Sequence, residues 1–159
     1  MTTHTVKFIK LLEDAIPFKY SRETDACMDI YAAEDVTVWT NHTAKVFSGI
    51  AVQLPIGFEG IVRGRSGLAL KGIHVHTGTI DEEYRGDISV IMNNLTEAPF
   101  YIKKGMRIAQ FTIKPVHRIE LEEVQELSNT ERGSKMLYNL CSISLFNNFI
   151  SILVEFIVL

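Results

Sequence analysis

Short segments that alternate apolar and polar residues recur along most of this chain, and they constrain its fold more than any other feature. A period of two is the repeat of a β-strand that buries one face. The expected strands span residues 6–11, 35–39, 44–47, 51–54, 58–63, 88–92, 99–102 and 108–113. Short strands separated by polar turns predict a closed all-β domain, either a sandwich or a barrel.

Two segments depart from this pattern. Residues 66–71 are the clear helix candidate before the C-terminal tail, with Ser66 as a candidate N-cap and Gly72 as a candidate terminator. Residues 136–159 are mostly apolar, contain a single charged residue and lack the alternation. We therefore expect a β-barrel domain over residues 1–135 and an atypical apolar tail over residues 136–159.

Composition excludes several classes of function. The chain has 159 residues and a net charge of -3, which does not favour broad nucleic-acid binding. Its two cysteines cannot build a disulfide framework, so we expect a reducing compartment, the cytoplasm or, in a eukaryote, the nucleus. The N-terminus lacks the pattern of a signal peptide. The tail is long enough to span a bilayer, but its asparagines and its glutamate argue against a membrane partner.

Two polar segments follow one another closely in the middle of the chain. Residues 78–86 read Gly-Thr-Ile-Asp-Glu-Glu-Tyr-Arg-Gly, which we interpret as the tip of a β-hairpin that carries a polar site. Before them, Arg65, Ser66 and Gly67 offer a cation, a hydroxyl and a glycine backbone, which are groups that bind phosphate. Asp81 is a carboxylate that can orient and deprotonate a water. Together these groups suggest metal-assisted attack on a phosphate.

Four segments, in order, resemble motifs of the trimeric dUTPase family (dUTP nucleotidohydrolases). They are Ala26-Cys27-Met28-Asp29-Ile30-Tyr31, Gly64-Arg65-Ser66-Gly67-Leu68-Ala69, the segment from Gly78 to Gly86, and Gly105-Met106-Arg107-Ile108-Ala109-Gln110. The first departs from the family's usual Ala-Gly-Tyr-Asp-Leu, because Cys27 and Met28 replace the glycine and the aromatic residue, but Asp29 is kept. The resemblance implies a distorted jelly-roll β-barrel and a homotrimer with active sites between subunits.

The resemblance also implies an activity, a cofactor and a set of site residues. The activity is hydrolysis of dUTP to dUMP and pyrophosphate with Mg²⁺, which limits dUTP and supplies dUMP for thymidylate synthesis. Asp81 is the expected catalytic residue, and Asp29 is expected to reach the metal indirectly, through water. The expected substrate-binding residues are Arg65, Ser66, Gly67, Gly78, Thr79, Ile80, Tyr84, Ser89, Gln110 and Arg132.

These residues are expected to bind different parts of the nucleotide. Arg65, Ser66, Gly67 and Gln110 would hold phosphate oxygens, and Arg132 would reach the γ-phosphate. The backbone near Gly78, Thr79 and Ser89 would read uracil, and the ring of Tyr84 would pack under the deoxyribose and exclude a 2′-hydroxyl.

Simpler interpretations of single residues remain open. Asp81 by itself fits a turn, Asp29 fits the end of a strand, Gln110 fits the polar face of a strand, and Tyr84 fits ordinary packing. His74 and His76 share a strand face as metal ligands do, but no third ligand is evident, so we interpret them as a surface pair or a pair at a trimer axis. The dCTP deaminases share the fold, but the Asp81 and Tyr84 segment matches dUTPases better.

The C-terminus is where the resemblance fails. The family's fifth motif is a glycine-rich arm, roughly Arg-Gly-x-x-Gly-Phe-Gly-Ser-Thr-Gly, which closes over the nucleotide. Here Arg132-Gly133-Ser134-Lys135 begins it, and Met136-Leu137-Tyr138-Asn139-Leu140 then replaces the glycines and the phenylalanine. This loss motivates an alternative function: a catalytically weak dUTPase-like protein that binds nucleotide or a protein partner.

Overall fold

The structure is a computed structural model that describes residues 5–134. The chain divides into two units, Met1–Ile119 and Glu120–Leu159. Every described strand and helix lies in the first unit. In the second unit the described residues are exposed and form only irregular structure and turns, including a turn closed by a hydrogen bond from the Gly133 N–H to the Thr130 carbonyl (3.1 Å).

The first unit is built from short strands and one short helix, as the alternating sequence predicts. In chain order the elements are β1 (Lys7–Lys10), β2 (Met28–Tyr31), β3 (Val36–Val38), β4 (Thr43–Val46), β5 (Ile50–Gln53), β6 (Phe58–Arg63), α1 (Ser66–Ala69), β7 (Ile73–Val75), β8 (Gly78–Ile80), β9 (Val90–Asn94), β10 (Phe100–Ile102) and β11 (Arg107–Pro115).

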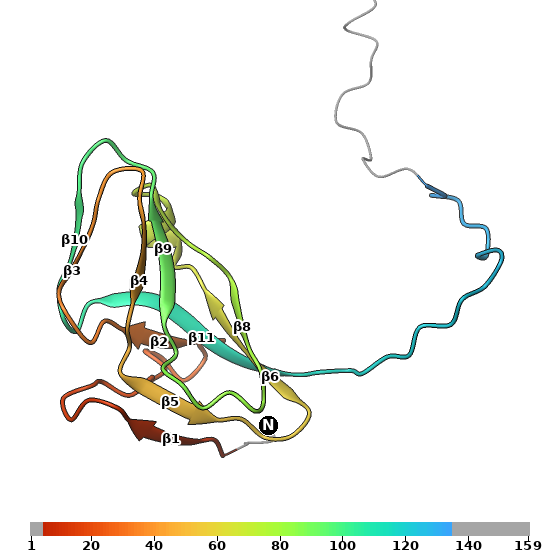
Figure 1. The fold of residues 1–159 in the computed structure, drawn as a ribbon, viewed down its shortest axis with the longest axis horizontal. Helices are drawn as coiled ribbons and strands as arrows, with labels where there is room; N and C mark the ends of the chain where they lie inside the picture. The colour runs from red at the N-terminus through yellow and green to blue at the C-terminus, as the bar shows by residue number, and fades with distance from the viewer. Residues whose placement is uncertain (1–4, 135–159) are drawn as a thin grey trace, which may run out of the picture. The chain divides into compact units, whose positions relative to one another are not determined.

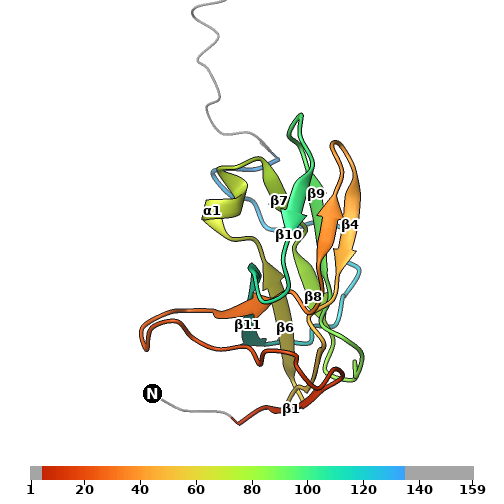
Figure 2. The same ribbon diagram turned by 90° about the vertical axis from the view of Figure 1, so that its left-hand side faces the viewer.

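Four small antiparallel sheets enclose the core (Figures 1 and 2). The largest has the order β2-β11-β6-β8, and a second has the order β4-β9-β7. Two pairs, β1-β5 and β10-β3, complete the arrangement. Most neighbours in these sheets are far apart in sequence, so the sheets bring together segments that the sequence separates widely.

The core is filled by the inward side chains of alternate strand residues. In β7, Ile73 and Val75 are buried while His74 between them is exposed, which is the period-two pattern of a half-buried strand. Phe111 of β11 is fully buried, and its ring lies against Gly60 of β6. A Cβ added at Gly60 would be 2.5 Å from the Cζ of Phe111, so this contact depends on glycine.

All eight predicted strands are confirmed, with ends that shift by up to two residues. The sequence reading missed β2, β7 and β8, which have only three or four residues each. The predicted hairpin at residues 78–86 is wrong: β8 pairs with β6, and the strand that follows, β9, pairs with β4 and β7. Its two arms therefore belong to different sheets.

The helix prediction is partly right. Helix α1 spans Ser66–Ala69, but the N-cap position is Arg65, with no side-chain capping bond, so Ser66 is the first helical residue and not the cap. Gly72 does end the segment, since its φ of +76° is a left-handed conformation that favours glycine. Among the described residues, no helix has both the length and the apolar character needed to cross a membrane.

Candidate active site

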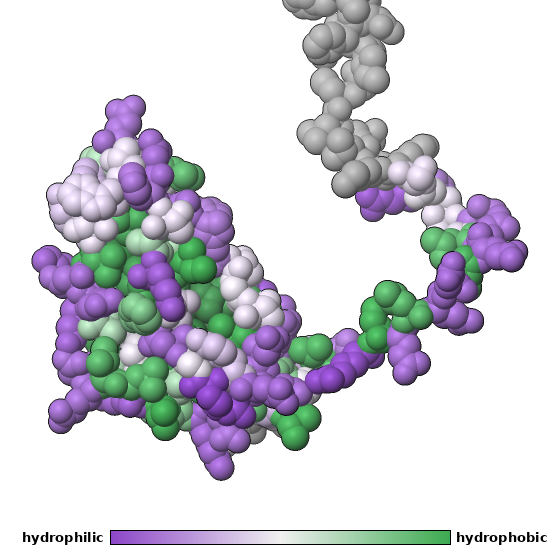
Figure 3. All heavy atoms as spheres, in the orientation of Figure 1, coloured by the Kyte–Doolittle hydropathy of each residue, from purple (hydrophilic) through white to green (hydrophobic). Residues whose placement is uncertain are grey.

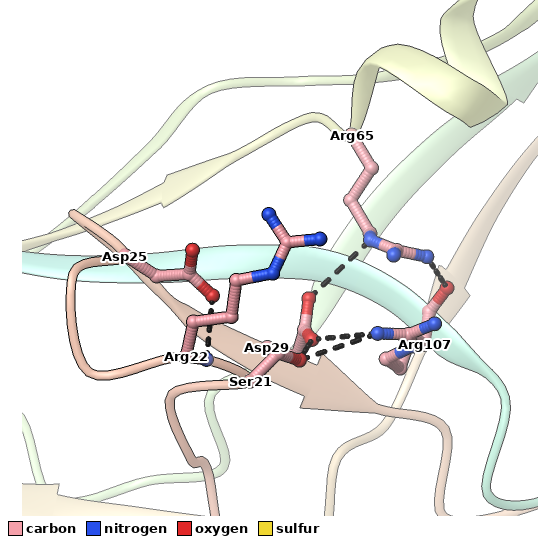
Figure 4. Close-up of polar contacts among 6 residues, drawn as sticks. All are labelled: Ser21, Arg22, Asp25, Asp29, Arg65 and Arg107. Atoms are coloured by element: carbon pink, nitrogen blue, oxygen red, sulfur yellow. Dashed lines mark hydrogen bonds and ion pairs between the residues drawn. The ribbon is translucent and has the colours of Figure 1, made fainter.

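Asp29 of β2 lies at the centre of a polar cluster on the largest sheet (Figure 4). Its side chain is only 5% exposed. The Ser21 hydroxyl donates to Oδ2 at 2.6 Å, Nη1 of Arg107 lies 3.2 Å from the same oxygen, and Nε of Arg65 lies 3.4 Å from Oδ1. A buried carboxylate held by two cations and a hydroxyl is well compensated, and it fixes both guanidinium groups in place.

Strand pairing places Gln110 beside Asp29. In the antiparallel register, Gln110 of β11 lies opposite Asp29 of β2 on one side and opposite Arg63 of β6 on the other. Residues directly opposite one another in an antiparallel sheet project from the same face. Asp29, Gln110 and Arg63 therefore form one rung of the sheet, and the expected phosphate residue Gln110 lies next to the carboxylate that orients Arg65.

A β-bulge adds Arg107 to this face. The register shifts between Arg107 and Ala109: Arg107 lies opposite Tyr31, and Ala109 lies opposite Ile30. In a regular strand, residues three apart project from opposite faces, so Arg107 and Gln110 would point away from each other. The bulge reverses Arg107 toward Asp29, which is a common effect of bulges near functional sites. Arg107 is a residue that the sequence reasoning missed.

Arg65 and its neighbours join the cluster from the start of α1. Besides Asp29, Arg65 contacts the backbone of β11, since its Nη1 donates to the Arg107 carbonyl at 3.0 Å. Arg65 itself has extended backbone angles (φ −99°, ψ 131°), and its carbonyl accepts from the N–H groups of Leu68 and Ala69. A Cβ added at Gly67 would meet no atom within 4 Å, so the space in front of this backbone is open to a ligand.

Tyr31 lies at the end of β2, opposite Arg107 in the strand register. Burial raises the pKa of its phenol above the usual value, and the negative charge of Asp29 adds to the rise. Arg107 and Arg65 act in the opposite direction, but their effect is smaller. Tyr31 therefore stays neutral at the pH values at which an enzyme works, and it adds no charge to the cluster.

Asp81 and Tyr84 lie in a second region, in the loop after β8. They line a cavity of about 550 Å³ together with Thr79, Gly57 and Arg118. The carboxylate of Glu82 anchors the loop, since it accepts from the Gly57 N–H and pairs with Arg118 at 2.9 Å.

The ring of Tyr84 has a defined place in this loop. Its hydroxyl donates to the Asp87 carbonyl at 3.0 Å, and its ring covers Gly86. A Cβ at Gly86 would be 2.6 Å from the Cζ of Tyr84, so the ring position depends on the glycine. The residue is still 43% exposed, and a rigid, partly exposed aromatic side chain is suited to pack against a flat ligand.

Asp87 ties the end of this loop to the body of the domain, and the sequence reasoning missed it. Its carboxylate accepts from the N–H groups of Ser48 and Gly49 (3.2 and 2.6 Å) and from the Ser89 hydroxyl (2.7 Å). Ser89, an expected uracil contact, thus uses its hydroxyl to hold the loop.

The other expected uracil contacts lie on β8, which pairs with β6. Ile80 lies opposite Gly60, Thr79 lies opposite Ile61, and Gly78 lies opposite Val62.

Within one chain, these two regions are separate. The residues that line the Asp81 and Tyr84 cavity include neither Asp29 nor Arg65 nor Gln110. The expected phosphate residue Arg132 belongs to the second unit of the chain. The departure from the fifth motif, at residues 136–140, lies outside the described residues. The structure therefore unites Asp29, Arg65, Ser66, Gly67 and Gln110, and it places Asp81 and Tyr84 elsewhere.

A metal ion has no ready-made set of protein ligands here. The described part of the chain contains no group of three or more His, Cys, Asp or Glu residues that could hold a metal ion. Two carboxylate oxygens accept about four hydrogen bonds. Three protein donors reach Asp29, so its capacity fits one further donor such as a metal-bound water. The residues present thus fit a Mg²⁺ ion that is carried by phosphates and water.

His74 and His76 form a surface pair. Both are exposed, and their rings meet edge to face with centroids 5.5 Å apart. A ring nitrogen of His76 also bonds to Oδ1 of Asn93 on the neighbouring strand.

Known proteins that resemble this chain over most of its length share one description. A family model described as dUTPase matches residues 13–138. The deoxyuridine 5'-triphosphate nucleotidohydrolase of Clostridium tetani is 43% identical over 136 residues, which cover 84% of this chain and 94% of the relative. The enzyme of the same name from Clostridium kluyveri is 48% identical over 124 residues, which cover 76% and 86%.

Solved structures extend the agreement to the fold. The Staphylococcus bacteriophage 80alpha dUTPase with dUpNHpp has a TM-score of 0.80 and 29% identity, with 85% of this chain and 97% of that chain covered. A point mutant of the dUTPase from phage phi11 of S. aureus, described with a structural Mg(II) ion, has a TM-score of 0.75 and 25% identity, with 79% and 100% covered. These proteins have a jelly-roll-like fold, so the predicted jelly-roll-like β-barrel is confirmed, and the chain belongs to the dUTPase family.

Proposed function

We propose that this protein hydrolyses dUTP to dUMP and pyrophosphate, as a dUTP diphosphatase that limits dUTP and supplies dUMP for thymidylate synthesis. The observation that carries the proposal is the pairing of two sites on one family scaffold. One is a phosphate-binding cluster around Asp29, and the other is a carboxylate beside an aromatic platform, Asp81 beside Tyr84. Neither site by itself supplies both phosphate binding and a base.

Asp81 acts as the general base. Its carboxylate orients a water and takes a proton from it as the water attacks the α-phosphorus, and the bond to the bridging oxygen breaks so that pyrophosphate leaves. Arg65, with Ser66 and the backbone of Gly67, holds phosphate oxygens by charge-assisted hydrogen bonds. Gln110 adds a neutral donor beside them, and Arg132 reaches the γ-phosphate.

The nucleoside is selected at the second region. The Tyr84 ring, fixed over Gly86, packs under the deoxyribose and leaves no space for a 2′-hydroxyl. Backbone groups near Gly78, Thr79 and Ile80 read uracil, and Ser89 contributes through its backbone while its hydroxyl holds Asp87.

Mg²⁺ bound to the triphosphate would offset phosphate charge and restrict the geometry of the phosphate chain. Asp29 is the protein group that would hold a metal-bound water, while it also orients Arg65 and Arg107. This role is indirect, in keeping with the absence of a cluster of metal ligands in the described residues.

A homotrimer would bring the two regions together. Asp81 and Tyr84 line a cavity apart from the phosphate cluster of their own chain, so a second copy is needed to complete the site. An apolar surface is available for such assembly: Figure 3 shows hydrophobic side chains over β1 and β5. The apolar residues Val6, Phe8, Ile9, Ala51 and Val52 line a groove of about 580 Å³ there. We propose active sites between subunits.

Two broader assignments accompany this function. We place the protein in a reducing, intracellular environment, most simply the cytoplasm, because its two cysteines cannot build a disulfide framework and Cys27 forms no disulfide within residues 5–134. We also propose that residues 1–135 are the dUTPase domain and that residues 136–159 are an appended segment. The relatives named above are named as hydrolases, and none of them points to the alternative of a catalytically weak binding module.

The experiment is pyrophosphate release from dUTP by the purified protein and by Asp81→Asn, which keeps the shape of the side chain and removes the base. Loss of a general base lowers the rate by about 10²–10⁴-fold. Glu97→Gln is the control, because it removes one carboxylate charge at an exposed position outside this cavity. Equal rates for the parent and Asp81→Asn would refute the assignment of the base.

A further inference from the structure

Arg22 is a charged residue beside the phosphate cluster that neither the sequence motifs nor the proposed mechanism uses. It precedes β2 in the chain and is exposed. Within residues 5–134 its guanidinium has no hydrogen bond or ion pair, whereas Arg65 and Arg107 are both engaged with Asp29. Figure 4 shows this guanidinium pointing toward Asp29 and Arg65 and away from Asp25.

The backbone that carries Arg22 is fixed on both sides. The preceding residue, Ser21, donates its hydroxyl to Asp29 at 2.6 Å. On the other side a turn is closed twice: the Arg22 N–H donates to Oδ2 of Asp25 at 2.9 Å, and the Asp25 N–H donates to the Arg22 carbonyl at 3.1 Å. An Asp side chain that accepts from a nearby backbone N–H stabilises such a turn. These hydrogen bonds fix the backbone of Arg22, while its exposed side chain can contact a ligand.

The charges of the cluster do not balance. Figure 4 shows three guanidinium groups, those of Arg22, Arg65 and Arg107, and two carboxylates, those of Asp29 and Asp25. Asp29 pairs with Arg65 and Arg107, and Asp25 accepts from a backbone N–H, so one positive charge is left in excess. A surface with more cations than partner anions attracts an anionic ligand, and the attraction grows with the charge of that ligand.

We propose that Arg22 is a further substrate-binding residue of the phosphate cluster, and that it favours the triphosphate over the monophosphate. This inference rests on the proposed function and deepens it. Arg65 and Arg107 form the fixed floor of the cluster because Asp29 orients both of them. Arg22 is the movable cation that closes on the ligand, and its effect is greatest on dUTP, which carries more negative charge than the product dUMP.

The test compares Arg22→Gln with the parent, and it uses two probes: the non-hydrolysable analogue α,β-imido-dUTP and the product dUMP. Isothermal titration calorimetry at fixed ionic strength gives the Kd of each. A charge-assisted contact of this kind corresponds to about a tenfold change in affinity. We expect Arg22→Gln to weaken binding of α,β-imido-dUTP about tenfold, and that of dUMP less than about twofold, because the monophosphate carries less charge.

Lys45→Gln is the matched control. It removes one positive charge from β4, in a different sheet, where the Lys45 Nζ lies 4.7 Å from the centroid of the Phe47 ring. Both probes should bind Lys45→Gln almost as they bind the parent. Arg22→Lys keeps the charge and should recover much of the affinity for α,β-imido-dUTP, which a purely structural role of Arg22 would not predict.

The possible results separate this inference from the proposed function. If the parent hydrolyses dUTP and Arg22→Gln binds both probes as Lys45→Gln does, the role of Arg22 is refuted and the function stands. If Arg22→Gln weakens dUMP as much as α,β-imido-dUTP, the preference for the triphosphate is refuted. A parent that neither binds α,β-imido-dUTP nor hydrolyses dUTP refutes both proposals.

Discussion

The substitution Asp29→Asn tests how the phosphate cluster is held together. Asparagine keeps the volume of the side chain, but it replaces one acceptor oxygen by an NH₂ group that only donates. Ser21, Arg65 and Arg107 all donate to the carboxylate. Whichever oxygen the NH₂ group replaces, one donor will then face another donor. The two guanidinium groups also lose the charge that separates and orients them.

The size of the effect follows from burial. The Ser21 bond, 2.6 Å long and made to a charged acceptor, contributes about 1.5 kcal/mol. Arg65 is 26% exposed and contributes about 1 kcal/mol, while Arg107 is 48% exposed and contributes about 0.5 kcal/mol, because water screens both pairs. The remaining oxygen of asparagine retains part of this, so we expect the free energy of unfolding to fall by about 2 kcal/mol.

The assay is urea denaturation followed by far-ultraviolet circular dichroism, at one protein concentration for all variants because assembly couples to stability. The KM for dUTP should rise in parallel, since Arg65 and Arg107 lose their orientation. Asp35→Asn is the control. Asp35 pairs with Lys103 on the exposed surface, so this substitution should shift the midpoint of urea denaturation little. A midpoint for Asp29→Asn that equals that of Asp35→Asn would refute the view that Asp29 organises the cluster.

Four further predictions follow from the structure. Tyr84→Ala, and Gly86→Ala through collision with the Tyr84 ring, should both lower the preference for dUTP over UTP, measured as the ratio of kcat/KM values; equal use of the two nucleotides by the parent would rule out this role. Gly67→Ala should leave the melting temperature nearly unchanged, because its Cβ meets no protein atom, but should raise the KM for dUTP; an unchanged KM would show that no phosphate approaches this backbone. Tyr31 should ionise above the usual pH range of tyrosine in a spectrophotometric titration, with Tyr31→Phe as the reference. The part of the free energy of unfolding that depends on its neutral form is then complete below pH 10 and falls as the pH rises further. Titration of all tyrosines near pH 10 would contradict this. Deletion of residues 136–159 should change turnover little and improve solubility, whereas grafting Gly-Phe-Gly-Ser-Thr-Gly after residue 135 should raise turnover; loss of activity on deletion would show that the tail closes the site.

The proximity of several residues around Asp29 is predictable from the sequence because these residues lie in short contiguous motifs. Arg65, Ser66 and Gly67 are neighbours in the chain, so their proximity needs no knowledge of the fold. Asp29 and Gln110 are far apart in the sequence, and only their place in the motifs suggests that they act together. The pairing of β2 with β11 places them opposite each other in the sheet. Their roles in binding and catalysis remain predictions.

Arg107 shows where reading from strand periodicity fails. It lies in the same motif as Gln110, but the odd spacing between them predicts opposite faces of a strand. A bulge between Arg107 and Ala109 reverses that expectation, and nothing in the local alternation signals it. The signal in the sequence was the positive charge of Arg107 within this motif. That charge points to Asp29 only when it is known that the Asp29 carboxylate can accept from a second cation besides Arg65.

The hairpin at residues 78–86 fails for a different reason. Alternation identifies a strand, but it does not identify the strand's partner. β8 pairs with β6, and β9 lies between β4 and β7, so the loop that carries Asp81 and Tyr84 crosses from one sheet to another. The distance between this loop and the phosphate cluster is a property of the fold and of its assembly, which short motifs do not encode.

The rung formed by Asp29, Gln110 and Arg63 makes activity a gauge of correct folding. A slip of one residue between β2 and β11 would turn Gln110 to the far side of the sheet from Asp29, and the same slip would misplace Arg107. A chain with this slip would therefore lack the arrangement of Asp29, Gln110 and Arg107 on which the proposed phosphate binding depends. In a refolded sample, the specific activity relative to that of the native protein would then fall as chains with a slipped register accumulate.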